Sequence, residues 1–368
     1  MIAIIGASVS GNNTAYLLAK AGYEVRVFEE HKEIGKPFAC TGIVTHHIND
    51  AFPLPKRLIL NEVYQHRIFS PDGSSVDFSL KRPDCILDRV GLDRHLKELA
   101  EKQGARFELG CRFAGLNERP LSVRIEKKGS AREFACQAVI GADGPLSPVA
   151  KAAGLFGKRS FITGVQATAK LRNENIIETY LFKGGFAWVV PISSSEVRIG
   201  LVSHEVPGSR LKSFLESRIG KSYEECIIER QAGLEPLYNP LVRSQKDHIY
   251  LVGDAATQVK AATFGGIIQS LLASKVLANC IASGKNYDSA WKRQFGRDLL
   301  LSLMIRRILD SFSDKDCNKL VATFNDKGLQ KVISSSSRDF PSRFALRLLM
   351  KKPSLLAYAR FLPAALGI

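Results

Sequence analysis

The chain has 368 residues, 45% of them hydrophobic and 24% charged, which is the balance of a globular protein with a sizeable core and excludes long disordered segments. Lysine and arginine total 52 against 36 aspartates and glutamates, and the net charge of +16 favours anionic partners. Nucleic acid is not expected among them, because basic residues nowhere interleave with aromatic residues as in a base-stacking surface.

The seven cysteines are scattered and form no Cys-x-x-Cys pair, so we expect neither a disulfide framework nor a metal site. The first residues have the character of a core strand rather than of a signal peptide, and the chain lacks an apolar run of about 18 residues or more. These features predict a cytoplasmic protein.

The first thirty residues change from a strand pattern to a helix pattern and back. Residues 2–5 form a short apolar run that stops at Gly6, residues 12–21 carry apolar side chains at helical spacing, and residues 24–28 form a second apolar run. This order predicts a βαβ unit and therefore a parallel sheet.

Later segments continue the sheet and add a second one. Residues 89–103 resemble an amphipathic helix, and apolar strands are expected at 135–140 and 249–252, the latter followed by a helix over about 265–283. Between them, β-rich runs alternate with turn residues and predict an antiparallel sheet from the segments 162–171, 176–182, 186–191 and 197–202.

We therefore predict an α/β protein with an α+β second domain. A Rossmann-like dinucleotide-binding domain is expected from 1–60, 85–158 and 245–285, and an antiparallel-sheet substrate domain from 61–84 and 159–244. Residues 286–368 are expected to form a helical, basic C-terminal region.

The segment Gly6-Ala7-Ser8-Val9-Ser10-Gly11 lies between strand and helix, where a dinucleotide fingerprint is found. Gly6 would permit the tight turn, Gly11 would let helix and strand pack closely, and the helix N-terminus would attract a pyrophosphate. Glu29, after the second strand, would accept hydrogen bonds from the ribose hydroxyls. Ser8 departs from the pattern, because glycine at that position lets the backbone approach the diphosphate. Taken alone, the segment could also be a glycine-rich turn that simply joins strand to helix.

Two further loops follow predicted strands in the same way, Gly141-Ala142-Asp143-Gly144 and Gly253-Asp254-Ala255-Ala256. Ligands of parallel sheets bind at the carboxyl edge where such loops gather. Asp254 would accept hydrogen bonds from a ribityl chain, and a helix beginning near Gly265-Gly266-Ile267 would direct its positive end at a flavin ring. The three loops together predict FAD.

Four segments resemble the geranylgeranyl reductases, a branch of the flavoproteins built like p-hydroxybenzoate hydroxylase. The most specific is residues 33–42, Glu-Ile-Gly-Lys-Pro-Phe-Ala-Cys-Thr-Gly, which is similar to that family's Gly-x-Pro-x-x-Cys loop. Arg89 with its helix, the stretch 259–267 and residues 186–191, Phe-Ala-Trp-Val-Val-Pro, match further family segments. The resemblance covers about residues 1–285.

The resemblance implies roles for individual residues. Cofactor contacts are expected at Gly6, Ser10, Gly11, Glu29, Cys40, Thr41, Arg89, Phe113, Asp254, Gly266 and Ile267. Prenyl-chain contacts are expected at Phe186, Trp188 and Pro191, although a strand tryptophan could also be plain core. Cys40 is the candidate catalytic residue, as a proton donor or gate, with a small apolar filler as the alternative.

The chain also departs from the family pattern. Ser8 and Phe264 replace glycines, Val190 replaces a phenylalanine, and Ala150 replaces an arginine. These departures concern cofactor affinity and substrate identity more than the fold.

The resemblance implies an FAD-dependent reductase that saturates isoprenoid double bonds of a prenyl lipid, an archaeal-type membrane lipid precursor. The reductant is open between NAD(P)H and ferredoxin, so an electron-donor protein is a possible partner. Two alternatives remain: a flavin monooxygenase or halogenase of the same fold, and a non-catalytic paralogue that binds prenyl lipid without flavin.

The segment 338–368 predicts contact with an anionic membrane surface. It carries six basic residues and one acidic residue, interspersed with large apolar side chains. The basic residues are Arg338, Arg343, Arg347, Lys351, Lys352 and Arg360, and the apolar ones Phe344, Leu348, Leu349, Leu355, Leu356, Phe361 and Leu362. We therefore expect a peripheral protein on the inner face of the cell membrane.

Overall fold

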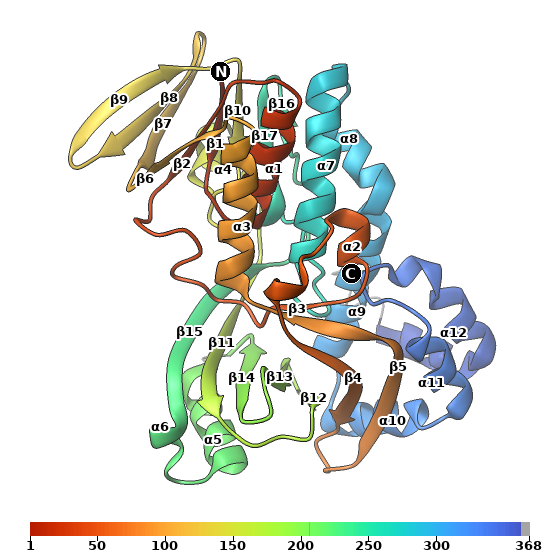
Figure 1. The fold of residues 1–368 in the computed structure, drawn as a ribbon. Coiled ribbons are helices and arrows are strands. Elements are labelled where there is room, and N and C mark those ends of the chain that lie inside the picture. The colour runs from red at the N-terminus through yellow and green to blue at the C-terminus, as the bar shows by residue number, and fades with distance from the viewer. Residues whose placement is uncertain (206, 362–368) are drawn as a thin grey trace.

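The computed structural model describes residues 1–205 and 207–361 and contains three β-sheets (Figure 1). The first sheet is mainly parallel and has six strands in the order β16-β17-β10-β1-β2-β6, in which only β16 is antiparallel to its neighbour. Its strands are β16 (Gln245–Lys246), β17 (Ile249–Leu251), β10 (Ala138–Gly141), β1 (Ile2–Ile5), β2 (Val25–Glu29) and β6 (Arg106–Leu109).

Strand β1 shows why this sheet needs cover on both faces. Ile2 and Ile4 belong to one core cluster, with the helices α1 (Val9–Lys20) and α7 (Ile267–Ser283), whereas Ala3 and Ile5 belong to a second cluster on the opposite face. Such alternation is the period of a strand, and a strand buried on both faces is apolar throughout. The predicted βαβ unit is confirmed, although α1 begins three residues earlier than expected.

A three-stranded antiparallel sheet covers the second face and was not predicted. It consists of β7 (Arg112–Glu118), β8 (Leu121–Lys127) and β9 (Ser130–Ala135), with Val123 and Ile125 packed in the same cluster as Ile5. The strand expected over 135–140 is confirmed as β10, but it begins at Ala138, because Ala135 still belongs to β9. The exposed, polar β9 lacks the apolar alternation that would have shown the break.

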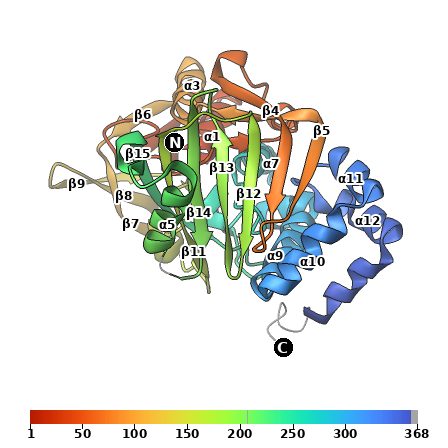
Figure 2. The ribbon, with the colours of Figure 1, turned by 90° about the horizontal axis from the view of Figure 1, so that it is seen from below.

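The eight-stranded sheet has the order β15-β11-β14-β13-β12-β4-β5-β3, and only β12 and β4 pair in parallel. The predicted antiparallel runs are confirmed as β11 (Phe161–Lys170), β12 (Ile176–Phe182), β13 (Gly185–Pro191) and β14 (Glu196–Ser203). Figure 2 shows these strands side by side. The sheet is completed by β15 (Ile227–Pro236), β4 (Ile59–Phe69), β5 (Ser75–Leu87) and β3 (Ile43–Val44).

Helices fill the remaining space, and those after residue 296 gather beside β5 and β12 (Figures 1 and 2). Over the described ranges, no helix is both long and apolar enough to cross a membrane. The helices not yet given are α2 (Ile48–Ala51), η1 (Lys56–Leu58), α3 (Arg89–Lys102), α4 (Pro148–Ala152), α5 (Pro207–Ile219), α6 (Tyr223–Cys226), η2 (Gly253–Ala256), α8 (Tyr287–Trp291), the π-helical η3 (Lys292–Gly296), α9 (Arg297–Asp310), α10 (Asp314–Phe324), α11 (Lys327–Ser334), η4 (Pro341–Arg343), α12 (Ala345–Lys351) and η5 (Pro353–Phe361).

The division of the chain into domains stays a prediction. The short strand β3, within the range 1–60, pairs with β5 in the eight-stranded sheet, and β4 begins at Ile59. The range 85–158 contains both β6 and β10 of the six-stranded sheet and all of the three-stranded sheet.

Candidate active site

The three glycine-bearing loops meet at the carboxyl edge of the six-stranded sheet. Gly6 has φ +100°, and a Cβ there would lie 2.3 Å from the Ala142 carbonyl oxygen. A Cβ on Gly11 would lie 2.0 Å from the Gly6 oxygen, and one on Gly253 would lie 2.7 Å from Ser10 Oγ. Gly6 and Gly253 are therefore required by the close approach of another loop, and Gly11 by the close approach of Gly6 within its own loop, which is a stricter demand than the turn alone.

Ser8 occupies the position where the fingerprint normally has glycine. Its hydroxyl donates to Asp93 Oδ2 at 3.2 Å, and the same carboxylate forms a buried ion pair with Arg89 at 3.2 Å. Ser8 is also the N-cap residue of α1 in extended conformation. Contacts with α3 thus accommodate the serine. The departure at Ser8 therefore gives little support to the alternative of a non-catalytic paralogue without flavin.

A cavity of about 470 Å³ opens over these loops. Nine of the residues predicted to bind cofactor line it: Gly6, Ser10, Glu29, Cys40, Arg89, Phe113, Asp254, Gly266 and Ile267. Gly11 does not, because it packs against Gly6, and Thr41 faces the neighbouring cavity. The roles of these residues toward a cofactor stay predictions, but their positions bring the three loops and the Cys40 loop around one space.

Glu29 and Asp254 are the acidic groups predicted to contact the cofactor. Glu29 Oε2 accepts a hydrogen bond from the Ala7 backbone N–H at 2.7 Å, which holds the carboxylate against the first loop. Burial raises the pKa of Asp254 to about 6, and the charge of Arg89 opposes that rise. Gly266 lies next to Asp254 and is the N-cap of α7, so the positive end of a 17-residue helix faces this side of the cavity.

Two arginines without a predicted role hold the loops of the site together through hydrogen bonds to backbone carbonyls. Arg198 of β14 is buried and donates to the Thr41 carbonyl at 2.7 Å, which ties the Cys40 loop to the eight-stranded sheet. Arg159 donates to the carbonyls of Pro145 and Ala255 at 3.1 and 2.8 Å and so joins the second loop to the third. Arg198 has a sequence signal, because an arginine stands alone within an apolar strand; Arg159 has none.

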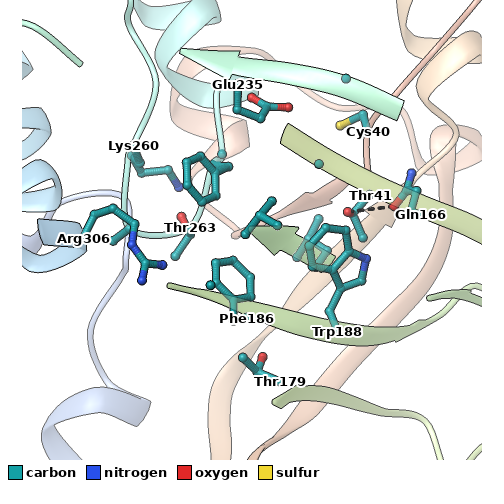
Figure 3. Close-up of a pocket in the computed structure, with 18 of the residues that line it drawn as sticks. Cys40, Thr41, Gln166, Thr179, Phe186, Trp188, Glu235, Lys260, Thr263 and Arg306 are labelled. Atoms are coloured by element: carbon teal, nitrogen blue, oxygen red, sulfur yellow. Dashed lines mark hydrogen bonds between the residues drawn. The ribbon is translucent and has the colours of Figure 1, made fainter. Parts of the chain in front are cut away.

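A second cavity of about 350 Å³ lies against the eight-stranded sheet and is largely apolar. Phe186 and Trp188 of β13, both expected to contact a prenyl chain, line this cavity with ring centroids 5.8 Å apart, whereas Pro191 at the end of the strand does not. Figure 3 shows Lys260 and Arg306 on the opposite side of this pocket from Cys40 and Thr41. Other apolar walls come from Ile68, Ile177, Leu181, Phe182, Val202 and Leu309.

Phe264 stands at the boundary of the two cavities and lines both. Its backbone is left-handed, with φ +53°, and its ring stacks on Phe186 at 6.1 Å. Glycine, which the resemblance leads us to expect at this position, would fit the backbone without strain. Here a strained phenylalanine supplies an aromatic wall instead, a function that the sequence pattern did not reveal.

The polar end of the second cavity is closed by ion pairs. The buried Lys260 ammonium binds Asp339, and Arg338 binds Asp84, which also pairs with His66. These contacts join the loop before α7 and strand β5 to the segment between α11 and η4. Across the described residues, no group of three or more His, Cys, Asp and Glu side chains is placed to hold a metal ion.

The residues of the larger cavity fit FAD. An acidic side chain stands at the end of β2 beside the N-terminus of α1, which is the arrangement that binds an adenosine ribose and a pyrophosphate. The N-terminus of α7 and Asp254 also line the cavity, and a flavin ring and a ribityl chain need such a partial positive charge and such an acceptor.

Comparisons with known proteins agree with this interpretation. Residues 4–47 match the family model of the NAD(P)-binding Rossmann-like domain. A geranylgeranyl bacteriochlorophyll reductase-like protein of Thermoplasma acidophilum superimposes with a TM-score of 0.85 at 22% identity over 98% of both chains. The flavin-dependent halogenase CmlS superimposes at 0.70 and 16% identity over 97% of this chain and 77% of its own. By fold and site, the protein is an FAD-dependent oxidoreductase.

Two relatives narrow that class. Digeranylgeranylglycerophospholipid reductase 2 of Methanothermobacter thermautotrophicus is 30% identical over 98% of each chain, and its namesake from Methanopyrus kandleri is 27% identical over 98% of each. The chain therefore belongs to the digeranylgeranylglycerophospholipid reductase family, and the resemblance that its motifs predicted is confirmed.

Proposed function

We propose that this protein saturates the isoprenoid double bonds of a geranylgeranyl lipid, a digeranylgeranylglycerophospholipid or a close precursor of an archaeal-type membrane lipid. The names of its relatives support this substrate class. The observation that carries the proposal is the shared wall of the two cavities: an apolar pocket suited to a prenyl chain adjoins the pocket whose residues fit FAD.

Bound FAD, once reduced, would supply a hydride to one carbon of the double bond. The protein's own residues would hold the cofactor through Glu29, Arg89 and Asp254, and would hold the prenyl chain against Phe186 and Trp188. The apolar wall would keep water from the reacting carbons. NAD(P)H or a ferredoxin would provide the electrons, and in the second case the donor is a protein partner.

The proposal is tested by anaerobic incubation of the FAD-loaded protein with dithionite and a geranylgeranylated glycerophospholipid, followed by mass spectrometry. We expect the lipid mass to rise in steps of two hydrogen atoms. Trp188→Ala should slow the reduction by about tenfold or more through lost contact area while FAD stays bound. A lipid of unchanged mass with wild-type, FAD-loaded protein contradicts the proposal.

A monooxygenase or halogenase of the same fold is the alternative, and the likeness to a flavin-dependent halogenase motivates its test. If the protein is a monooxygenase or a halogenase, the same lipid incubation in air with NADPH and chloride should give a product that carries oxygen or chlorine. A gain of hydrogen alone, seen only without oxygen, favours the reductase.

We also propose that the protein works at an anionic membrane surface, on the cytoplasmic face. The net charge of +16 supports attraction to such a surface. Part of the segment predicted to make this contact, residues 362–368 with Leu362, lies outside the described residues.

A further inference from the structure

Glu235 occupies a position between the two cavities that its sequence context does not announce. It is the penultimate residue of β15, the edge strand of the eight-stranded sheet, and pairs with Ile162 of β11. The end of β15 runs along the Cys40 loop, since a Cβ on Gly233 would lie 3.1 Å from the Ala39 Cβ. Figure 3 shows Glu235 and Cys40 at the same pocket.

The residues common to both cavities form a short boundary. It consists of Ala39, Cys40, Gly233, Glu235, Phe264, Gly266 and Ile267. Within this set, only Cys40 and Glu235 have ionisable side chains. A group that gives a proton to a substrate lying beside a cofactor has to be on such a boundary.

The surroundings of Glu235 oppose its ionisation. Burial and the nearby Asp254 carboxylate both raise the pKa of Glu235 well above its ordinary value. Among the residues that the structure describes, its carboxyl group has no hydrogen bond and no ion pair. Its partly accessible surface belongs to the walls of the two cavities.

Among the described residues that line the cavities, no cation is available to neutralise it. Every lysine, arginine and histidine that lines the cavities is paired with another carboxylate: Lys36 with Glu33, His31 with Glu29, Arg89 with Asp93, Arg112 with Glu126, His66 and Arg338 with Asp84, Lys260 with Asp339, and Arg306 with Asp310. A carboxyl group left without a counter-charge in such surroundings is shifted toward its neutral, protonated form.

We propose that Glu235 is the proton donor of the double-bond reduction. The inference rests on the proposed function and names the acid that the reaction needs. The π bond of the alkene is broken: one carbon receives a hydride from the reduced cofactor, and the other forms a C–H bond with the proton of Glu235. The carboxyl O–H bond breaks, and the carboxylate that remains is reprotonated from solvent before the next turnover.

Glu235→Gln tests this assignment, because glutamine keeps the size of the side chain and removes the acidic proton. With dithionite-reduced holoenzyme and a geranylgeranylated glycerophospholipid, we expect the rate of lipid reduction to fall by about 10²- to 10⁴-fold. The variant should retain FAD and still be reduced by dithionite. Glu225→Gln, an exposed carboxylate on the preceding helix α6, should reduce lipid at the wild-type rate.

The pH profile adds a second readout. The wild-type rate should fall as pH rises through the raised pKa of Glu235, because the carboxylate has no proton to give, and the residual rate of Glu235→Gln should lack that fall. A Glu235→Gln enzyme within about threefold of the wild-type rate, with an unchanged profile, overturns the proposal.

Infrared spectroscopy at neutral pH tests the proton without turnover. The wild-type protein should show the C=O stretch of a protonated carboxyl group that is missing from Glu235→Gln and present in Glu225→Gln. If wild-type protein never reduces the lipid, the proposed function fails, and this band alone still decides whether Glu235 holds a proton. A difference spectrum without the band overturns the inference.

Discussion

At residue 264 the backbone and the side chain make opposite demands. The left-handed φ of +53° suits glycine, whereas the ring is used as a wall against Phe186. Phe264→Gly and Phe264→Ala both remove the ring, but only alanine keeps a Cβ in the left-handed conformation. We therefore expect the alanine variant to have a free energy of unfolding about 1–2 kcal/mol lower than the glycine variant, measured by urea denaturation.

An ordinary helix position provides the control for that pair. Lys319 is exposed in the middle of α10. The variant Lys319→Gly should have a free energy of unfolding about 1 kcal/mol lower than Lys319→Ala, the opposite order to that at residue 264. If Phe264→Ala proves as stable as Phe264→Gly, the backbone at residue 264 is not left-handed in solution.

At the scale of elements, the segment between α11 and η4 is fastened to the body of the protein by Asp339. Its carboxylate is 1% exposed, binds the Lys260 ammonium and accepts a hydrogen bond from Thr45. Asp339→Asn leaves a buried ammonium without its counter-charge, which should lower the free energy of unfolding by about 3–5 kcal/mol. Glu126→Gln, which removes the surface partner of Arg112, should cost about 1 kcal/mol or less.

The same pair predicts a pH dependence. The Asp339 pKa lies well below its ordinary value: burial raises it, and the charges of Lys260 and Arg338 lower it by more. A carboxylate whose pKa is lowered by folding contributes stability above its unfolded pKa of about 3.9, and this contribution is lost as the pH falls further. The difference in stability between wild type and Asp339→Asn should be full above about pH 4 and shrink below it; a difference that grows in acid would contradict the assignment.

The molecule as a whole shows which features a sequence can predict. The βαβ unit and the strands 161–203 could be predicted because buried parallel strands are apolar throughout and half-buried strands alternate. The three-stranded sheet could not, because β9 is polar and exposed. Long-range partners such as Lys260 and Asp339, or Glu235 and its cavities, depend on contacts between distant segments that no local pattern encodes.

Contacts between distant segments also affect the C-terminal surface. They change which residues we expect to face a membrane. Arg338, Lys352 and Arg360 form ion pairs within the protein, and the Phe361 ring packs against Phe312 at a centroid distance of 5.0 Å. These contacts engage part of the segment predicted to bind a membrane, although the side chains of Lys352 and Arg360 stay 38% and 58% exposed. The outward-facing apolar side chains of α12 are instead Leu346 and Met350, 67% and 65% exposed, beside the exposed Arg347 and Lys351. Figure 2 shows α12 at the edge of the molecule.

From the exposed side chains of α12 we predict how the protein binds lipid vesicles. Leu346→Ser combined with Met350→Ser removes apolar area that could enter the headgroup layer, and should weaken binding to anionic vesicles by about tenfold or more in a sedimentation assay. Leu241→Ser is the control, because Leu241 is 86% exposed but lies in the loop between β15 and β16. Binding should also weaken with salt and be absent on neutral vesicles, since the attraction is partly electrostatic. Equal vesicle binding by the double variant and the wild type would mean that α12 does not touch the membrane.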